Sequence, residues 1–382
     1  MQTRVGFKCA SCTGQTAAGG GESRRRLLLL AGGALAMVVG GLVVAGVVGG
    51  EGPPTEGPAP AASPVSAERN VQFDGADGLT LGATLGLPAG AAAGDGLGAV
   101  VILPGFGPTD RNGLYPPGRP ADPLYRDLSE TLVDGGMVTF RYDKRGTGQS
   151  VLPPSDTLTF DDMVADAAAA VDFVAERAEI DAQRIAVVGH EEGGLVALQL
   201  AASDPRIASV VLVSVPGRPL VEVVADDFRN SGHGEDVEDL EAVVASLLAG
   251  EELPEPGALP ASVRGFFPVG QGEYARGLFS IDPVTLARRV DVPTLVVRGE
   301  RATGISADDA EALVGALGDE AQPLVAPDAG HTLLISDPAD ETAPAESDSS
   351  EHAGPSGAGS GFGHRDENAL TRIRDFLAST LA

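Results

Sequence analysis

From about residue 70 onward, short apolar runs alternate with amphipathic segments, and no other feature of this chain constrains its fold as strongly. Residues 99–103 form a continuous apolar run that ends at Pro104-Gly105, as in a strand buried on both faces. Residues 79–87 alternate large apolar residues with small or polar ones, as in a strand with one face in solvent. This alternation predicts an α/β fold with an open, doubly wound, mostly parallel sheet. Further strand-like runs are residues 137–142, 184–188, 209–213, 293–297 and 323–326. Helical patterns are residues 122–132, 163–178, 195–202, 307–317 and 369–381.

Two segments interrupt the alternation. Residues 217–289 are acidic and predicted to be helical, with residues 237–248 as the best helix. They lie between two sheet strands, where a lid over the strand ends would be inserted. Residues 336–368 are predicted to be a disordered acidic insertion, because the part from Asp337 to Glu351 has six acids, no bases and mostly Pro, Ala and Ser between them. The whole of residues 70–382 is thus expected to be one domain with two insertions.

The N-terminal region has the features of a membrane anchor. Residues 27–50 are 24 uncharged residues that follow Arg24-Arg25-Arg26, and about 20 apolar residues of helix cross a bilayer. The arginines precede this stretch and acids follow it, so the positive-inside rule predicts one transmembrane helix with residues 1–26 as a cytoplasmic tail. Residues 51–69, rich in Pro, Gly and Ala, are predicted to be a linker that holds an extracytoplasmic domain near the cell membrane.

The alternative for this region is export and release. The run from Ser23 to Leu28 resembles a twin-arginine export motif, and residues 59–61 (Ala-Pro-Ala) are a candidate cleavage site. Cleavage there would make Ala62 the first residue of the mature protein.

Charge and cysteine content exclude several classes of protein. The chain has a net charge of -28, and because residues 1–50 carry five bases and one acid, the remainder carries a net -32. Such a surface argues against nucleic acid as a partner. The two cysteines, Cys9 and Cys12, exclude a disulfide framework. They also lack the second ligand pair that a zinc site needs.

A strand–turn–helix pattern marks the most informative motif. Residues 185–198 consist of an apolar run, the turn Gly189-His190-Glu191-Glu192-Gly193 and a second apolar segment. The glycine spacing is that of the nucleophile elbow, G-x-S-x-G, in which a sharp turn projects one side chain above the sheet. An ordinary glycine-rich turn has the same local pattern, so this segment alone leaves both interpretations open.

Together with four other segments, the elbow resembles the α/β-hydrolase superfamily, and within it the serine aminopeptidase/dienelactone-hydrolase-like group. Residues 103–113 are similar to that group's oxyanion loop, and residues 141–148 to the turn after its next strand. Residues 294–302 resemble the strand and turn that carry the acid of the catalytic triad, and Ala329-Gly330-His331 resembles the segment that carries the base. The resemblance covers residue 70 to the end and implies an α/β-hydrolase fold with a helical lid. It also implies an oxyanion hole formed by the backbone N–H groups of Phe106 and Glu192.

The catalytic positions depart from the family pattern. Glu191 stands where the family has its nucleophilic serine, Ala302 stands where it has its aspartate, and His331 alone matches. A Ser–His–Asp triad needs a hydroxyl to attack, an imidazole to accept its proton and a carboxylate to orient that imidazole. Asp328 is near enough in sequence to leave the identity of the orienting acid open. The degenerate triad predicts a protein with impaired catalysis that binds a small ligand or a protein partner in the former active-site cleft.

Two other functions stay open. In one, Glu191 is itself a nucleophile, assisted by His331, in an active ester or amide hydrolase. In the other, the lid and the acidic insertion serve a structural or interaction role. No cofactor is expected, and the sequence spacing of His, Asp and Glu shows no metal site.

Overall fold

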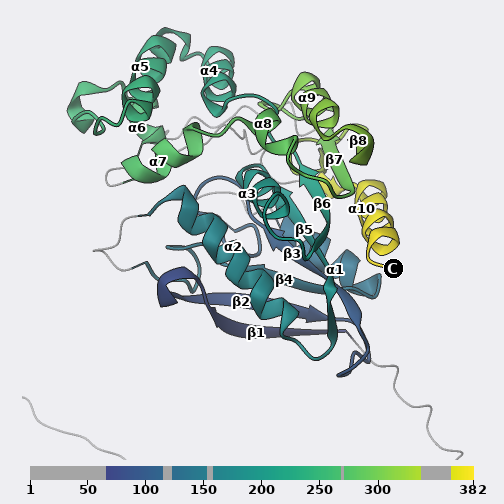
Figure 1. The fold of residues 1–382 in the computed structure, drawn as a ribbon. Coiled ribbons are helices and arrows are strands. Elements are labelled where there is room, and N and C mark those ends of the chain that lie inside the picture. Colours follow the sequence, from purple (N-terminus) through teal and green to yellow (C-terminus); the bar gives the residue numbers. More distant parts are fainter. Residues whose placement is uncertain (1–65, 115–122, 153–157, 268–270, 337–362) are drawn as a thin grey trace, which may run out of the picture. The chain divides into compact units, whose positions relative to one another are not determined.

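A sheet of eight strands organises the described part of the chain (Figure 1). The computed structural model describes residues 66–114, 123–152, 158–267, 271–336 and 363–382. The strand order is β1-β2-β4-β3-β5-β6-β7-β8, and β1 and β2 are antiparallel to their neighbours while β3 to β8 run parallel. The strands are β1 (Ala67–Asp74), β2 (Thr80–Leu87), β3 (Leu97–Leu103), β4 (Val138–Tyr142), β5 (Ile180–His190), β6 (Ile207–Val213), β7 (Thr294–Gly299) and β8 (Ala321–Ala326).

Helices cover both faces of this sheet, which explains the continuous apolar strands. In β3, Val101 belongs to the core shared with α2 (Phe160–Ala175) and α3 (Glu192–Ala201). Its neighbours Val100 and Ile102 belong to the opposite core, shared with α1 (Leu124–Asp134) and α10 (Glu367–Thr380). Successive side chains of a strand point to opposite faces, so a doubly covered strand is apolar throughout.

The helices begin and end where local capping chemistry favours it. Thr159 accepts a hydrogen bond from the backbone N–H of Asp162, and Asp162 caps the Thr159 N–H in return, a capping box that starts α2. Ser306 and Asp309 form the same arrangement at the start of α9 (Ala307–Leu317).

A group of helices lies between β6 and β7 in the chain, in the segment that the sequence predicts to be a lid (Figure 1). Its member α7 packs against α2, where a side chain on Gly277 would lie 2.9 Å from the Cβ of Phe160. Phe160 is the first residue of α2, which follows β4, so this contact lies at the carboxyl ends of the parallel strands. The lid helices are α4 (Leu220–Asn230), α5 (Val237–Leu248), α6 (Ala261–Phe266), α7 (Gly272–Phe279) and α8 (Pro283–Ala287).

The structure confirms the α/β fold, its mostly parallel sheet and the helical character of residues 217–289. Strand β1 was not expected. Its side chains are mostly exposed and include Glu68, Arg69 and Asp74, so it lacks the apolar pattern of an inner strand. It begins at Ala67, inside the segment that was expected to be linker.

The predicted disordered insertion, residues 336–368, is wrong at its C-terminal end. Residues 363–365 form β10 (Gly363–Arg365), which pairs with β9 (Leu334–Ser336), and α10 begins at Glu367. The Arg365 guanidinium contacts Asp127 of α1 at 2.9 Å, which fixes this end of the segment on the domain. Residues 337–362 lie outside the described residues.

The predicted tail, transmembrane helix and most of the linker, within residues 1–65, also lie outside the described residues. Within the described ranges, no helix combines the length and apolar character needed to cross a bilayer.

Candidate functional site

The turn between β5 and α3 is a nucleophile elbow in its backbone geometry. Glu191 lies between the last residue of β5 and the first of α3, with φ 48° and ψ -114°. An L-residue rarely adopts such a positive φ, and strained residues of this kind cluster at functional sites. The turn thus holds the Glu191 side chain above the sheet, as the glycine frame in the sequence indicated.

Two glycines make this turn possible. A Cβ on Gly189 would lie 2.3 Å from the carbonyl oxygen of Gly193, and a Cβ on Gly193 would lie 2.4 Å from that of Leu103. No real side chain tolerates these separations from backbone atoms. The elbow interpretation is therefore favoured over an ordinary glycine-rich turn.

The carboxylate of Glu191 accepts a hydrogen bond from one of the two backbone N–H groups expected to form the oxyanion hole, that of Phe106. The backbone N–H of Phe106 donates a hydrogen bond of 2.9 Å to Glu191 Oε2. A Cβ on the adjacent Gly105 would lie 2.2 Å from the same oxygen, so the loop closes tightly around it. The Glu191 carboxylate thus lies at the Phe106 N–H, which is expected from the sequence to stabilise a substrate's developing negative oxygen.

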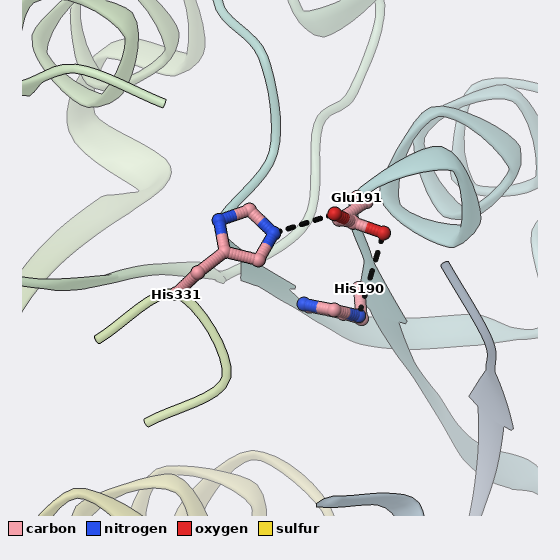
Figure 2. A group of neighbouring side chains, drawn as sticks. All are labelled: His190, Glu191 and His331. Carbon is pink, nitrogen blue, oxygen red and sulfur yellow. Dashed lines mark hydrogen bonds and ion pairs between the residues drawn. The ribbon is translucent and has the colours of Figure 1, made fainter. Parts of the chain in front are cut away.

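His331 contacts the other oxygen of the same carboxylate. Its Nε2 lies 2.6 Å from Glu191 Oε1, and both side chains are buried (Figure 2). Ser214 donates a hydrogen bond of 2.6 Å to the His331 carbonyl, which ties the base segment to the end of β6. The tertiary structure thus brings the predicted base to the predicted nucleophile position.

The surroundings keep the Glu191 carboxylate ionised. Burial raises its pKa and is the largest single influence, but His190, His331 and the Phe106 N–H together outweigh it and hold the pKa at about 2. A carboxylate in this state accepts hydrogen bonds and does not donate a proton.

No acid orients the other side of the His331 ring within the described residues, where its buried Nδ1 has no hydrogen-bond partner. Ala302 lies just beyond β7, where its N–H donates to the Gly299 carbonyl. Asp328, the open candidate, has an exposed side chain that pairs with Arg301 at 3.4 Å. Asp328 therefore does not replace the missing triad acid.

Glu192 has a structural partner that the sequence did not indicate. Its buried carboxylate pairs with Lys144 Nζ at 3.4 Å, and the same Nζ donates a 2.5 Å hydrogen bond to the Gly105 carbonyl. Burial, together with the charge of Glu192 and a hydrogen bond to it, raises the pKa of Tyr274 in the lid helix α7. Lys144 and Glu192 thus connect the oxyanion loop, the elbow and the lid.

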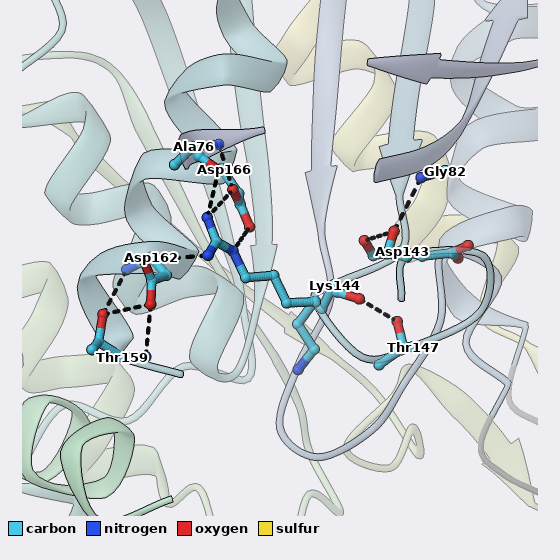
Figure 3. Close-up of polar contacts among 10 residues, drawn as sticks. Ala76, Gly82, Asp143, Lys144, Thr147, Thr159, Asp162 and Asp166 are labelled. Carbon is cyan, nitrogen blue, oxygen red and sulfur yellow. Dashed lines mark hydrogen bonds and ion pairs between the residues drawn. The ribbon is translucent and has the colours of Figure 1, made fainter. Parts of the chain in front are cut away.

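The turn after β4 is held by two buried carboxylates (Figure 3). Asp143 accepts hydrogen bonds from the backbone N–H groups of Arg111 and Gln149 at 3.0 and 2.7 Å. Arg145 makes a two-pronged contact with Asp166 of α2, at 2.7 and 2.9 Å. These contacts place Lys144, between them in sequence, under the oxyanion loop.

Two residues near Glu191, Tyr125 and Lys144, were not predicted from the sequence. The contact of His190 with the Glu191 carboxylate was not predicted either. Tyr125 donates to or accepts from His190 Nδ1 at 3.0 Å and accepts the Gly105 N–H at 2.8 Å. Only Lys144 had a usable signal, because the chain has just two lysines. His190 is buried, with Nδ1 3.9 Å from Glu191 Oε2.

Comparisons with known proteins agree with the fold. Residues 123–227 match the family model of the serine aminopeptidases, S33. Esterase EstD of Thermotoga maritima is 28% identical over 242 residues, which are 62% of this chain and 54% of that protein. The uncharacterized protein PA2218 of Pseudomonas aeruginosa is 35% identical over 153 residues, 39% of this chain and 38% of that protein. The chain thus matches about half the length, or less, of these relatives.

The crystal structure of PA2218 superposes with a TM-score of 0.53 at 22% identity, covering 82% of this chain and 94% of that one. A likeness at this identity shows the fold. The family match over residues 123–227, the Thermotoga relative and the elbow support membership of this chain in the α/β-hydrolase superfamily.

Proposed function

We propose that the protein is a catalytically impaired α/β-hydrolase whose former active-site cleft binds a small ligand or a protein partner. One observation carries the proposal: the Glu191 carboxylate contacts both the Phe106 N–H and His331 Nε2. Acyl transfer on a serine needs a hydroxyl there and an empty oxyanion hole. The Thermotoga relative is named an esterase. At the elbow of this chain, however, Glu191 stands where a serine esterase would have its nucleophile.

A fluorophosphonate probe tests this proposal. The full-length chain is expected to remain unlabelled, since the probe reacts with an activated serine and the elbow has none. The variant Glu191→Ser with Ala302→Asp is the positive control. Stoichiometric labelling of the unmodified chain would place an active serine elsewhere and contradict the proposal.

A second candidate is an active ester or amide hydrolase that uses Glu191 as nucleophile. The 2.6 Å contact between His331 Nε2 and Glu191 Oε1 favours it, because a histidine at that place can activate water against a covalent intermediate. However, Glu191 Oε2 already accepts the Phe106 N–H expected in the oxyanion hole, and His331 Nδ1 has no partner in the described residues. A screen on generic ester substrates separates the two functions, since turnover that is lost in Glu191→Ala would select the hydrolase.

A third candidate is an interaction module. Its motivation is the acidic segment from Asp337 to Glu351, which has six acids and no bases. Loss of a bound partner on deletion of residues 337–351, with the rest of the chain still folded, would select it over ligand binding in the cleft.

We further propose that residues 27–50 anchor the domain in the cell membrane, with residues 51–382 outside. The support is the charge asymmetry across the uncharged stretch. Protease added to intact spheroplasts is expected to digest the domain, while a cytoplasmic control protein survives. Survival of the domain would indicate the opposite orientation. A mature N-terminus at Ala62 would instead support twin-arginine export and release.

A further inference from the structure

Three potential metal ligands converge at the elbow. One ligand atom each from His190, Glu191 and His331 lies within 4.8 Å of the other two (Figure 2). All three residues are buried, at 5%, 2% and 8% exposure. No local pattern indicated this cluster, because His331 is 140 residues from Glu191. We propose that this cluster binds a divalent transition-metal ion of the zinc type.

The donor set selects the class of metal. Two imidazoles and one carboxylate are a ligand set that Zn²⁺ uses in sites with an open coordination position. Calcium and magnesium prefer a shell of oxygen ligands, which this cluster does not offer. The first-row transition metals that accept imidazole are therefore the expected occupants, with zinc as the metal to test.

Binding one zinc ion requires the three side chains to move, because their ligand atoms lie within 4.8 Å of one another but are not at the spacing of a bound site. Ligands bound at about 2.0–2.1 Å to a tetrahedral zinc ion lie roughly 3.3 Å apart. Glu191 Oε1 and His331 Nε2 are now 2.6 Å apart, and Glu191 Oε2 and His190 Nδ1 are 3.9 Å apart. A metal ion would replace the hydrogen between Glu191 and His331 and would displace the Tyr125 hydroxyl from His190 Nδ1.

The electrostatic surroundings favour a cation at this place. Glu192, next in sequence, is already matched by Lys144 at 3.4 Å. Glu191 is buried and lies 2.6 Å from His331 Nε2 and 3.9 Å from His190 Nδ1, and a buried carboxylate is stable only when it is paired or bound to a metal. The Phe106 N–H, 2.9 Å from Glu191 Oε2, would keep the carboxylate oriented while it binds.

The second ring nitrogen of His331, Nδ1, limits the affinity for zinc that we expect. A metal-bound histidine normally donates its other ring N–H to an acceptor, and loss of that partner lowers metal affinity about 10–100-fold. His331 Nδ1 has no such acceptor among the described residues. We therefore expect zinc to bind more weakly here than in a site where every metal-bound histidine donates its other ring N–H to an acceptor.

The test is a zinc titration of the full-length chain after chelator treatment, with a chromophoric competitor. Cys9→Ser and Cys12→Ser are introduced first, because those thiols can bind zinc themselves. This parent chain is expected to bind one zinc ion. Glu191→Gln and His331→Gln should each weaken binding about tenfold or more, since each removes one ligand. Zinc should raise the melting temperature of the parent and not of these variants.

The matched control is His233→Ala. His233 lies 3.9 Å from Asp236 in the lid region, a histidine beside a carboxylate without a second imidazole, and its replacement should leave zinc binding unchanged. Two results would overturn the proposal: a parent chain that binds no zinc, or binding that survives in folded Glu191→Gln and His331→Gln. Neither result depends on whether the protein turns over a substrate, so the proposed loss of catalysis is tested separately.

Discussion

Replacing Glu191 by Ser together with Ala302 by Asp is expected to produce measurable esterase activity above that of the unmodified chain. The change restores the hydroxyl and the acid, and it also frees the Phe106 N–H of the expected oxyanion hole from Glu191 Oε2. The carboxylate introduced in place of Ala302 would follow Arg301, whose N–H donates to the Ala329 carbonyl beside the His331 segment at 2.9 Å. Hydrolysis of a short-chain nitrophenyl ester at fixed pH is the measurement.

The expected gain is about 100-fold or more over the unmodified chain, which is far below the roughly 10⁶-fold that a complete triad contributes. Recovery is partial because catalytic groups must be placed to about 0.5 Å. Each single variant should recover much less than the pair, since triad members act as a unit. A folded double variant with no activity above the unmodified chain would remove the support for Glu191 and Ala302 as the triad positions. An unmodified chain that is equally active would favour Glu191 as a nucleophile.

Asp166→Ala is expected to destabilise the domain by about 3–5 kcal/mol, because it leaves a buried guanidinium without its main partner. Arg145 and Asp166 are 8% and 1% exposed and contact each other through two hydrogen bonds. Asp166 also accepts the Ala76 N–H at 2.8 Å, so the substitution frees a backbone donor as well. The free energy of unfolding from urea denaturation is the measurement.

The control for this prediction is Glu130→Ala. It breaks the Arg126–Glu130 pair, which has a contact of 2.8 Å but side chains 60% and 55% exposed. Water screens such a pair, so the free energy of unfolding should stay close to that of the unmodified chain. A second variant, Arg145→Met with Asp166→Leu, removes both buried charges and should cost less than Asp166→Ala alone. Equal effects of Asp166→Ala and Glu130→Ala would contradict the assigned role of burial.

The local sequence was sufficient to predict helices and strands whose boundaries are set by neighbouring residues. The helix predicted at residues 307–317 was found at those bounds, because Ser306 and Asp309 cap its start and its apolar period is regular. Strand β1 was missed for the opposite reason. It is an edge strand with exposed, charged side chains, and its pairing with β2 rather than its own composition makes it a strand.

A strand–turn–helix with glycines at fixed spacing is specified by neighbouring residues, so the α/β-hydrolase resemblance and the elbow could be predicted from the sequence, with Glu191 and Ala302 at the positions of the family's serine and aspartate. The contacts of Glu191 could not be predicted in this way. Its contacts with Phe106 and His331 join residues 85 and 140 positions apart. The absence of a partner for His331 Nδ1 among the described residues depends on where β7 and Asp328 lie. Such distances follow from how the sheet and its loops pack, which no local pattern of residues encodes.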